Sequence, residues 1–141
     1  MTIIESVKNF IATCPYFSDM AKIKVDFLDD KNKALSVEEV PTETVLERYL
    51  DGSSERQFVF VVAARLRYND EVRRNINNSG IFENVQNWLE DCTEEGNLPT
   101  LGEGLTPLKI EAMSNGYLFG IDGDLANARY QIQCRLIYDK E

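Results

Sequence analysis

Residues 56–67 read RQFVFVVAARLR, and residues 128–138 read ARYQIQCRLIY. The first segment contains an unbroken apolar run, Phe58 to Ala64. A strand that is apolar on both faces is predicted to lie centrally in a sheet, packed on each side or against a neighbouring subunit. The second segment alternates apolar and polar residues, which is typical of a strand with one buried face. These two segments predict that a β-sheet is the centre of the fold.

The residues before the apolar run predict a partner strand. Residues 42–50 are rich in β-forming side chains, and residues 51–55, DGSSE, are turn formers. Together with residues 56–67 they predict a long antiparallel hairpin. Shorter strands are expected over residues 23–27, 108–113 and 117–119.

Helical patterns occupy the start and the middle of the chain. A capping box at residues 2–5 begins a first helix of about three turns. Asn69 is expected to cap a second helix, which the Asn-Ser-Gly of residues 78–80 interrupts. A third helix is expected over residues 81–92, where apolar residues recur at steps of three and four, with Gly96 ending it.

The order of these elements sets the expected fold class. Strands that follow one another without βαβ alternation favour an α+β domain. We expect residues 1–141 to form one domain with a largely antiparallel sheet, a long central hairpin and helices packed on one face.

Composition excludes several classes of function. The chain is 43% hydrophobic and 28% charged, within the range of soluble globular proteins. It contains no histidine, which excludes Ser-His-Asp and Cys-His catalysis and His-ligated zinc. The net charge of −9 has the wrong sign for holding nucleic-acid phosphates, and no apolar run is long enough to span a bilayer.

The remaining candidates for chemistry are weak. Three widely spaced cysteines without a CxxC motif suggest small buried side chains. The GEG of residues 102–104 lacks a preceding strand and a third glycine, and the DGD of residues 122–124 is expected to be a hairpin turn. The acids among residues 38–47 favour a solvated face over an acid-base pair. We therefore expect a protein that is not an enzyme, with no catalytic, cofactor-binding or metal-binding residues and no membrane partner.

Charge is distributed unevenly along the chain. Residues 1–55 hold 6 basic and 11 acidic side chains, residues 56–92 hold 5 and 5, and residues 93–141 hold 4 and 8. The central part contains a group of arginines, namely Arg65, Arg67, Arg73 and Arg74. These arginines are either ordinary solvated side chains or a subunit interface that meets an acidic end, such as Asp51, of a neighbouring copy in a head-to-tail contact.

Several segments spread over nearly the whole chain resemble one protein family. They are Cys14-Pro15-Tyr16, Val40-Pro41-Thr42, Tyr49-Leu50-Asp51-Gly52-Ser53, Arg56-Gln57-Phe58-Val59-Phe60, Asn78-Ser79-Gly80, Trp88-Leu89, Gly96-Asn97-Leu98-Pro99, Leu101-Gly102-Glu103-Gly104, Ser114-Asn115-Gly116-Tyr117-Leu118 and Ala128-Arg129-Tyr130-Gln131-Ile132-Gln133-Cys134. As a set they resemble the tail-terminator proteins, often labelled minor capsid proteins, of long-tailed phages and prophages of Gram-positive bacteria.

The resemblance implies a structural virion protein. Such a subunit is expected to assemble as a hexameric ring on the completed tail tube, to stop its polymerisation and to offer the surface that joins the head. The implied partners are further copies of the chain, the major tail-tube protein and a head-completion or connector protein, with DNA only in transit. The implied location is the head-tail interface of the virion, after synthesis in the bacterial cytoplasm.

Two alternatives stay open at this point. One is another head-tail joining or tail-adaptor protein of the same virion neck. The other is an unrelated enzyme or a small-molecule binding domain.

Overall fold

The computed structural model describes residues 1–68, 72–123 and 126–141, with only the backbone of residues 72–74. The elements in chain order are α1 (Ile3–Ile11), the 3-10 turn η1 (Pro15–Phe17), β1 (Lys24–Val25), β2 (Leu35–Glu39), β3 (Val45–Arg48), β4 (Ser54–Arg67), α2 (Val72–Glu95), β5 (Leu105–Ala112), β6 (Tyr117–Ile121) and β7 (Asn127–Lys140). Seven strands form one mixed, mostly antiparallel sheet, which confirms the α+β class.

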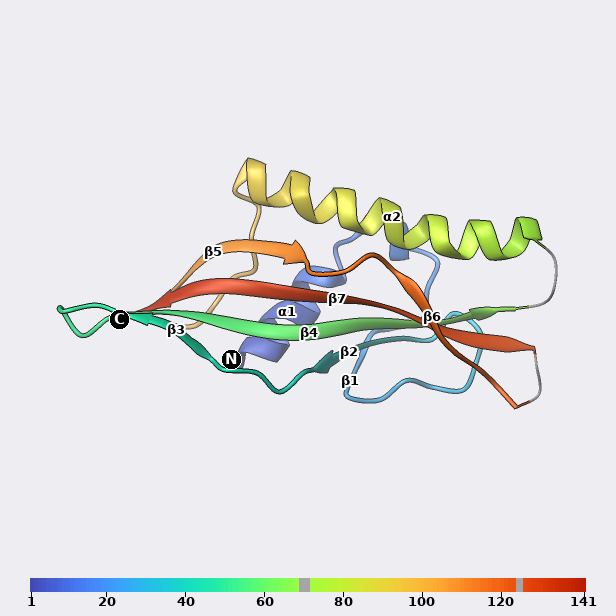
Figure 1. The fold of residues 1–141 in the computed structure, drawn as a ribbon, viewed down its shortest axis with the longest axis horizontal. Coiled ribbons are helices and arrows are strands. Elements are labelled where there is room, and N and C mark those ends of the chain that lie inside the picture. Colours follow the sequence, from blue (N-terminus) through green and yellow to red (C-terminus); the bar gives the residue numbers. More distant parts are fainter. Residues whose placement is uncertain (69–71, 124–125) are drawn as a thin grey trace.

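The sheet is built around β4 and β7 (Figure 1). They pair antiparallel over their whole length, from Ser54 opposite Lys140 to Arg67 opposite Asn127. β2 and β3 share the other edge of β4, and β5 and β6 share the other edge of β7. The predicted central position of the apolar run is therefore confirmed.

The hairpin predicted around residues 51–55 forms, but its arms are unequal. β3 covers only Val45–Arg48, whereas β4 extends over 14 residues. The rest of this edge of β4 is taken by β2, a strand that the sequence patterns did not predict. The predicted hairpin is therefore present but shorter than expected, and the long partner of β4 is β7, which lies far away in sequence.

The alternation predicted in residues 128–138 is confirmed. The apolar set of β7 faces the core, and the even-numbered residues of β4 lie beside it in the sheet. The buried core residues of the two strands are Phe58, Phe60, Val62, Ala64, Leu66, Ala128, Tyr130, Ile132, Cys134, Leu136 and Tyr138.

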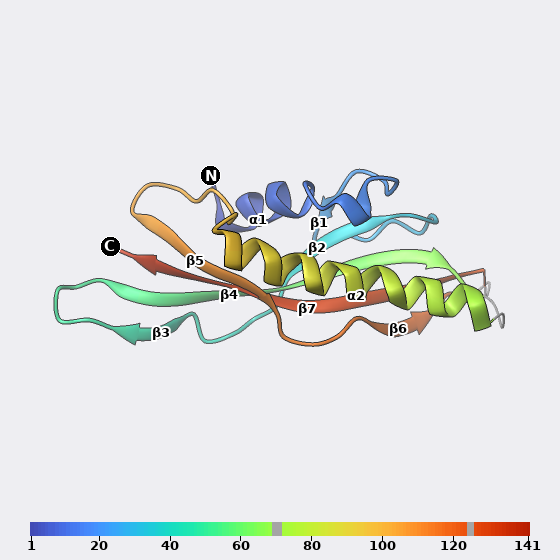
Figure 2. The same cartoon turned by 90° about the horizontal axis from the view of Figure 1, so that it is seen from above.

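Both helices contribute to the same core. Val7 and Ile11 of α1 join the core cluster, as do Phe82 and Leu89 of α2. The ring of Phe10 stacks on Trp88 at 5.1 Å between centroids, so the helices also contact each other. Figure 2 shows α1 and α2 along one side of the sheet. No helix covers the opposite face in the described part of the chain.

The break predicted at residues 78–80 is absent, because α2 continues through it to Glu95. A single glycine costs a helix only about 1 kcal/mol, and Asn78 supplies a tertiary anchor. Its Nδ2 donates to the Arg67 carbonyl oxygen at 2.8 Å. Gly96 ends the helix as predicted, with φ of +73° and the Asn97 amide donating to the Cys92 carbonyl oxygen. The predicted cap Asn69 lies outside the described residues.

The strand predicted over residues 23–27 is reduced to β1, which pairs parallel to β2. Ile23 is buried, but Val25 and Phe27 are exposed, so the alternating apolar residues of this segment do not form one buried face. Asp26 adopts a φ of +54° and ends the strand, and its Oδ1 accepts a hydrogen bond from the Glu39 amide. Within the described residues, no helix is both long and apolar enough to cross a membrane.

Candidate functional site

The proposed interface residues lie at the two ends of β4. Asp51 is at the tip of the β3–β4 hairpin, which forms one end of the molecule (Figure 1). Arg65 and Arg67 are at the other end of the strand, about 36 and 43 Å from Ser54 at roughly 3.3 Å per residue. Arg73 and Arg74 are in the first turn of α2, but their side chains lie outside the described structure. Asp51 and the arginines of one chain are therefore too far apart to meet.

The Arg65 side chain is bonded to other residues of the same chain. Its Nη1 forms an ion pair with Asp122, and its Nε donates to the Asp29 carbonyl oxygen at 2.7 Å. Only 15% of its side chain is exposed, whereas Arg67 is exposed. Arg65 thus joins β4 to the β1–β2 loop and to the start of the β6–β7 connection, and Arg67 is the member of the group that is described facing solvent.

A network of ion pairs lies on the sheet face opposite the helices. Arg129 of β7 reaches Glu38 of β2 across β4, with Nη2 to Oε1 at 2.8 Å. The Arg135 Nε donates to Glu111 Oε1 at 2.6 Å. Burial opposes ionisation of Glu111, but the bonds from Arg135 and Lys109 outweigh it and lower the pKa of this carboxyl. Val59, Val61, Ala63 and Ile137 of the same face are buried, so this face presents its charged and polar side chains rather than these apolar ones.

The β3–β4 hairpin ends in a defined apolar tip. The Gly52 amide donates to the Tyr49 carbonyl oxygen, and Gly52 has a φ of +92°, a conformation that favours glycine. Asp51 Oδ1 accepts from the hydroxyl of Ser53 at 2.6 Å and from its amide at 2.9 Å, and these bonds lower the pKa of the Asp51 carboxyl. Leu50 is fully exposed at the turn, at 109% of its reference area. The turn is therefore held by its own hydrogen bonds and exposes the Leu50 side chain to solvent.

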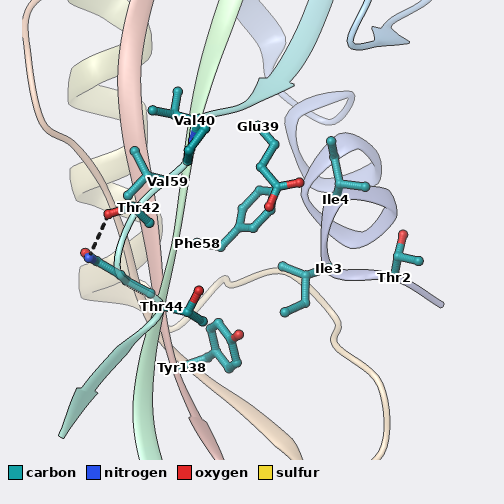
Figure 3. Close-up of a pocket in the computed structure, with 12 residues that line it drawn as sticks. Thr2, Ile3, Ile4, Glu39, Val40, Thr42, Thr44, Phe58, Val59 and Tyr138 are labelled. Carbon is teal, nitrogen blue, oxygen red and sulfur yellow. Dashed lines mark hydrogen bonds between the residues drawn. The ribbon is translucent and has the colours of Figure 1, made fainter.

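One hollow lies between the start of α1 and the segment that joins β2 to β3 (Figure 3). It has a volume of about 490 Å³, and Ile3, Phe58 and Tyr138 contribute apolar walls. Among the described residues that line it, Glu39 is the one carboxylate. Glu38 lies on the opposite face in its ion pair with Arg129, so the two adjacent acids are not brought together for acid-base chemistry.

The thiols are not activated. All three cysteines are buried and free. Burial raises the pKa of Cys14 to about 11, and it raises the pKa values of Cys92 and Cys134 as well. Because the thiolate is the nucleophile, these groups are poor candidates for covalent catalysis. In the described ranges, no group of three or more Cys, Asp or Glu side chains is arranged to hold a metal ion.

The sequence named Asp51 and the arginines as candidate interface residues but did not indicate the structural features around them. It gave no role to Leu50, although an aliphatic residue among turn-forming residues indicates an exposed apolar side chain. It also had no means of finding Glu38 opposite Arg129, because these residues are 91 positions apart in the chain.

Comparison with known proteins assigns no family. The chain matches no protein-family model and no curated protein, so the likeness to tail-terminator proteins rests on the sequence segments themselves.

Proposed function

We propose that this chain is a structural subunit of a phage tail. In this role several copies form a ring on the end of the tail tube, end its polymerisation and present the surface to which the head is joined. The tube subunit, a head-completion or connector protein and further copies of the chain are its partners, and DNA passes through without specific binding. The virion neck is its place of action.

One observation carries the proposal beyond the sequence resemblance. The subunit is a long sheet with two chemically different ends. One face carries no helix within the described residues, and the surface carries many large apolar side chains. The exposed ones on the strands and loops are Val25, Phe27, Leu46, Tyr49, Leu50, Leu108, Met113, Tyr117, Leu118, Phe119 and Ile121. Apolar side chains gathered at strand edges and tips are typical of surfaces that contact other proteins.

The dimensions are compatible with a ring around DNA. A head-to-tail contact is heterologous, so it closes into a ring when the rotation between copies allows it. If six copies repeat about every 36 to 43 Å, set by the length of β4, the ring is roughly 70 to 80 Å across at its midline. That leaves room for a duplex about 20 Å wide. A wall carrying some of the chain's acidic excess repels the phosphates in passage.

Tail-tube assembly in vitro tests the proposal. Purified tube subunits from the phage that encodes the chain are polymerised with and without it, and tube lengths are measured by negative-stain electron microscopy. We expect added chain to shorten the tubes in proportion to its concentration and to be found at one tube end. Tubes of unchanged length with no bound chain would contradict the proposal, whereas end binding without arrest of growth would favour the tail-adaptor alternative.

A further inference from the structure

A small hollow lined by lysines and apolar side chains lies at the end of the sheet opposite the hairpin tip. It lies between β1 and the loop that leads into β2, with a volume of about 140 Å³. Its apolar lining includes Ala21, Ala34 and Leu35, and three lysines, Lys22, Lys24 and Lys31, lie around it with one acid, Asp29. The hollow therefore combines an apolar floor with an excess of positive charge.

Two of these lysines have no acidic partner among the described residues. Lys24 is paired with Asp29 at 3.2 Å, and its ammonium lies 5.1 Å from the centroid of the Phe27 ring. No described ion pair includes Lys22 or Lys31, and both are exposed. Asp30 is also exposed nearby, but it does not line the hollow. The unpaired charge at the rim is thus positive.

The hairpin tip has the opposite charge. Its acids Glu47, Asp51 and Glu55 are in no described ion pair, and Arg48 is the one base among residues 45–55. Leu50 stands fully exposed among them. The tip thus offers an apolar side chain surrounded by negative charge.

The two surfaces cannot meet within one chain. The backbone of the loop beside the hollow is held at the Arg65 end of β4, because the Lys33 amide donates to the Arg65 carbonyl oxygen at 2.7 Å. Ser54, where β4 leaves the hairpin, is about 36 Å from Arg65 at roughly 3.3 Å per residue. A contact between tip and hollow therefore requires two copies.

We propose that the hairpin tip of one copy docks in the lysine-rimmed hollow of the next, with Leu50 in the hollow and the tip acids beside Lys22 and Lys31. The fixed turn at Tyr49–Gly52 presents Leu50 with little ordering cost, and the opposite charges set the register. This contact rests on the proposed function, because it is the head-to-tail contact that such a ring needs.

Zero-length carbodiimide cross-linking of the unmodified chain tests the contact. Equal amounts of ¹⁵N-labelled and unlabelled protein are cross-linked at high concentration, and linked peptides are identified by mass spectrometry. We expect mixed-isotope links from Glu47 or Asp51 to Lys22 or Lys31. Absence of such links, or links spread evenly over other, partly exposed lysines such as Lys8 and Lys109, overturns the contact.

Charge reversal supplies the matched control. Glu47→Lys reverses the charge of a hairpin acid that makes no described side-chain bond, and Lys22→Glu with Lys31→Glu inverts the rim. Glu47→Lys is expected to reduce linkage from Asp51 to the rim lysines by about tenfold. Both variants are expected to reduce cosedimentation of copies by a similar factor, and their combination is expected to restore it. Failure of the combination to restore it contradicts the contact. Leu50→Ala, an exposed change that leaves the charges in place, is expected to weaken it independently.

The outcomes separate this contact from the function on which it rests. If the chain shortens tail tubes but gives no tip-to-rim links, the function stands and this contact is wrong. If the links form but tube length is unaffected, the contact stands and the function is wrong.

Discussion

Arg129 and Glu38 join two strands that do not touch each other. The guanidinium donates to both carboxylate oxygens of Glu38, at 2.8 and 3.2 Å, and the pair spans β4 on the face opposite α1 and α2. The Arg129 guanidinium carbon also lies 5.1 Å from the centroid of the Phe119 ring. A two-point pair of this kind fixes geometry as well as charge. The pair therefore adds a side-chain link between β2 and β7 to the backbone ladders that each strand forms with β4.

Glu38→Gln tests this two-point pair. Both side chains are less than one quarter exposed, so the loss of the ionic bonds is expected to reduce the free energy of unfolding by about 1–2 kcal/mol. Glu39→Gln, at the adjacent exposed position, is the control and is expected to change it by less than about 0.5 kcal/mol. Urea denaturation measures both. Equal effects of the two substitutions would show that the pair adds nothing.

Asn78→Ala removes the bond between α2 and the end of β4. The Arg67 carbonyl oxygen loses its donor, and we expect a loss of about 1–2 kcal/mol of unfolding free energy. Asn77→Ala makes the same chemical change at an exposed helical position and isolates the gain in helix propensity. Thermal unfolding of the two variants compares them. A melting temperature for Asn78→Ala at or above that of Asn77→Ala contradicts the anchoring role.

Two glycines are predicted to respond in opposite directions to alanine. A Cβ at Gly80 meets nothing within 4 Å, so Gly80→Ala is expected to stabilise α2 by about 0.5–1 kcal/mol. A Cβ at Gly116 overlaps the side chain of Phe82 in the core, so Gly116→Ala is expected to cost about 1–3 kcal/mol. Chemical denaturation measures both. A destabilising Gly80→Ala would contradict the continuous helix.

Stability is predicted to fall in alkaline solution because of Cys14. Burial raises its pKa from 9.0 to about 11, so the folded state holds the thiol proton more tightly than the unfolded state. The resulting stabilisation is complete below pH 9 and is lost as the pH rises toward 11, at up to about 1.4 kcal/mol per pH unit. Unfolding free energies of the wild type and Cys14→Ala, measured from pH 8 to 11, give the comparison. Identical slopes for the two proteins would exclude this contribution.

The predictability of the fold depended on how far each pattern extends. The long alternation of β7 and the apolar run of β4 predicted their places, since both patterns cover whole strands. β2 was missed because only five residues form it and its last two are acidic. Residues 78–80 were read as a helix break because local propensity cannot include the Asn78 bond to Arg67. Where a local pattern gave a wrong or missing prediction, a tertiary contact determined the secondary structure.

The candidate site was less predictable than the fold. Sequence grouped Arg65 with Arg67, but the partners of Arg65 are 36 and 57 residues away, at Asp29 and Asp122. The lysine-rimmed hollow likewise exists only when the loop before β2 is placed against β4. What the sequence did suggest was two regions of unlike charge, and the length of β4 places them at opposite ends of the subunit.

Deletion of the gene from the encoding phage, followed by electron microscopy of the lysate, tests the central claim most directly. The structural-subunit account predicts tails of abnormal, excessive length that carry no heads, with normal length restored by the intact gene in trans. Normal, head-bearing tails in the deletion mutant would contradict it.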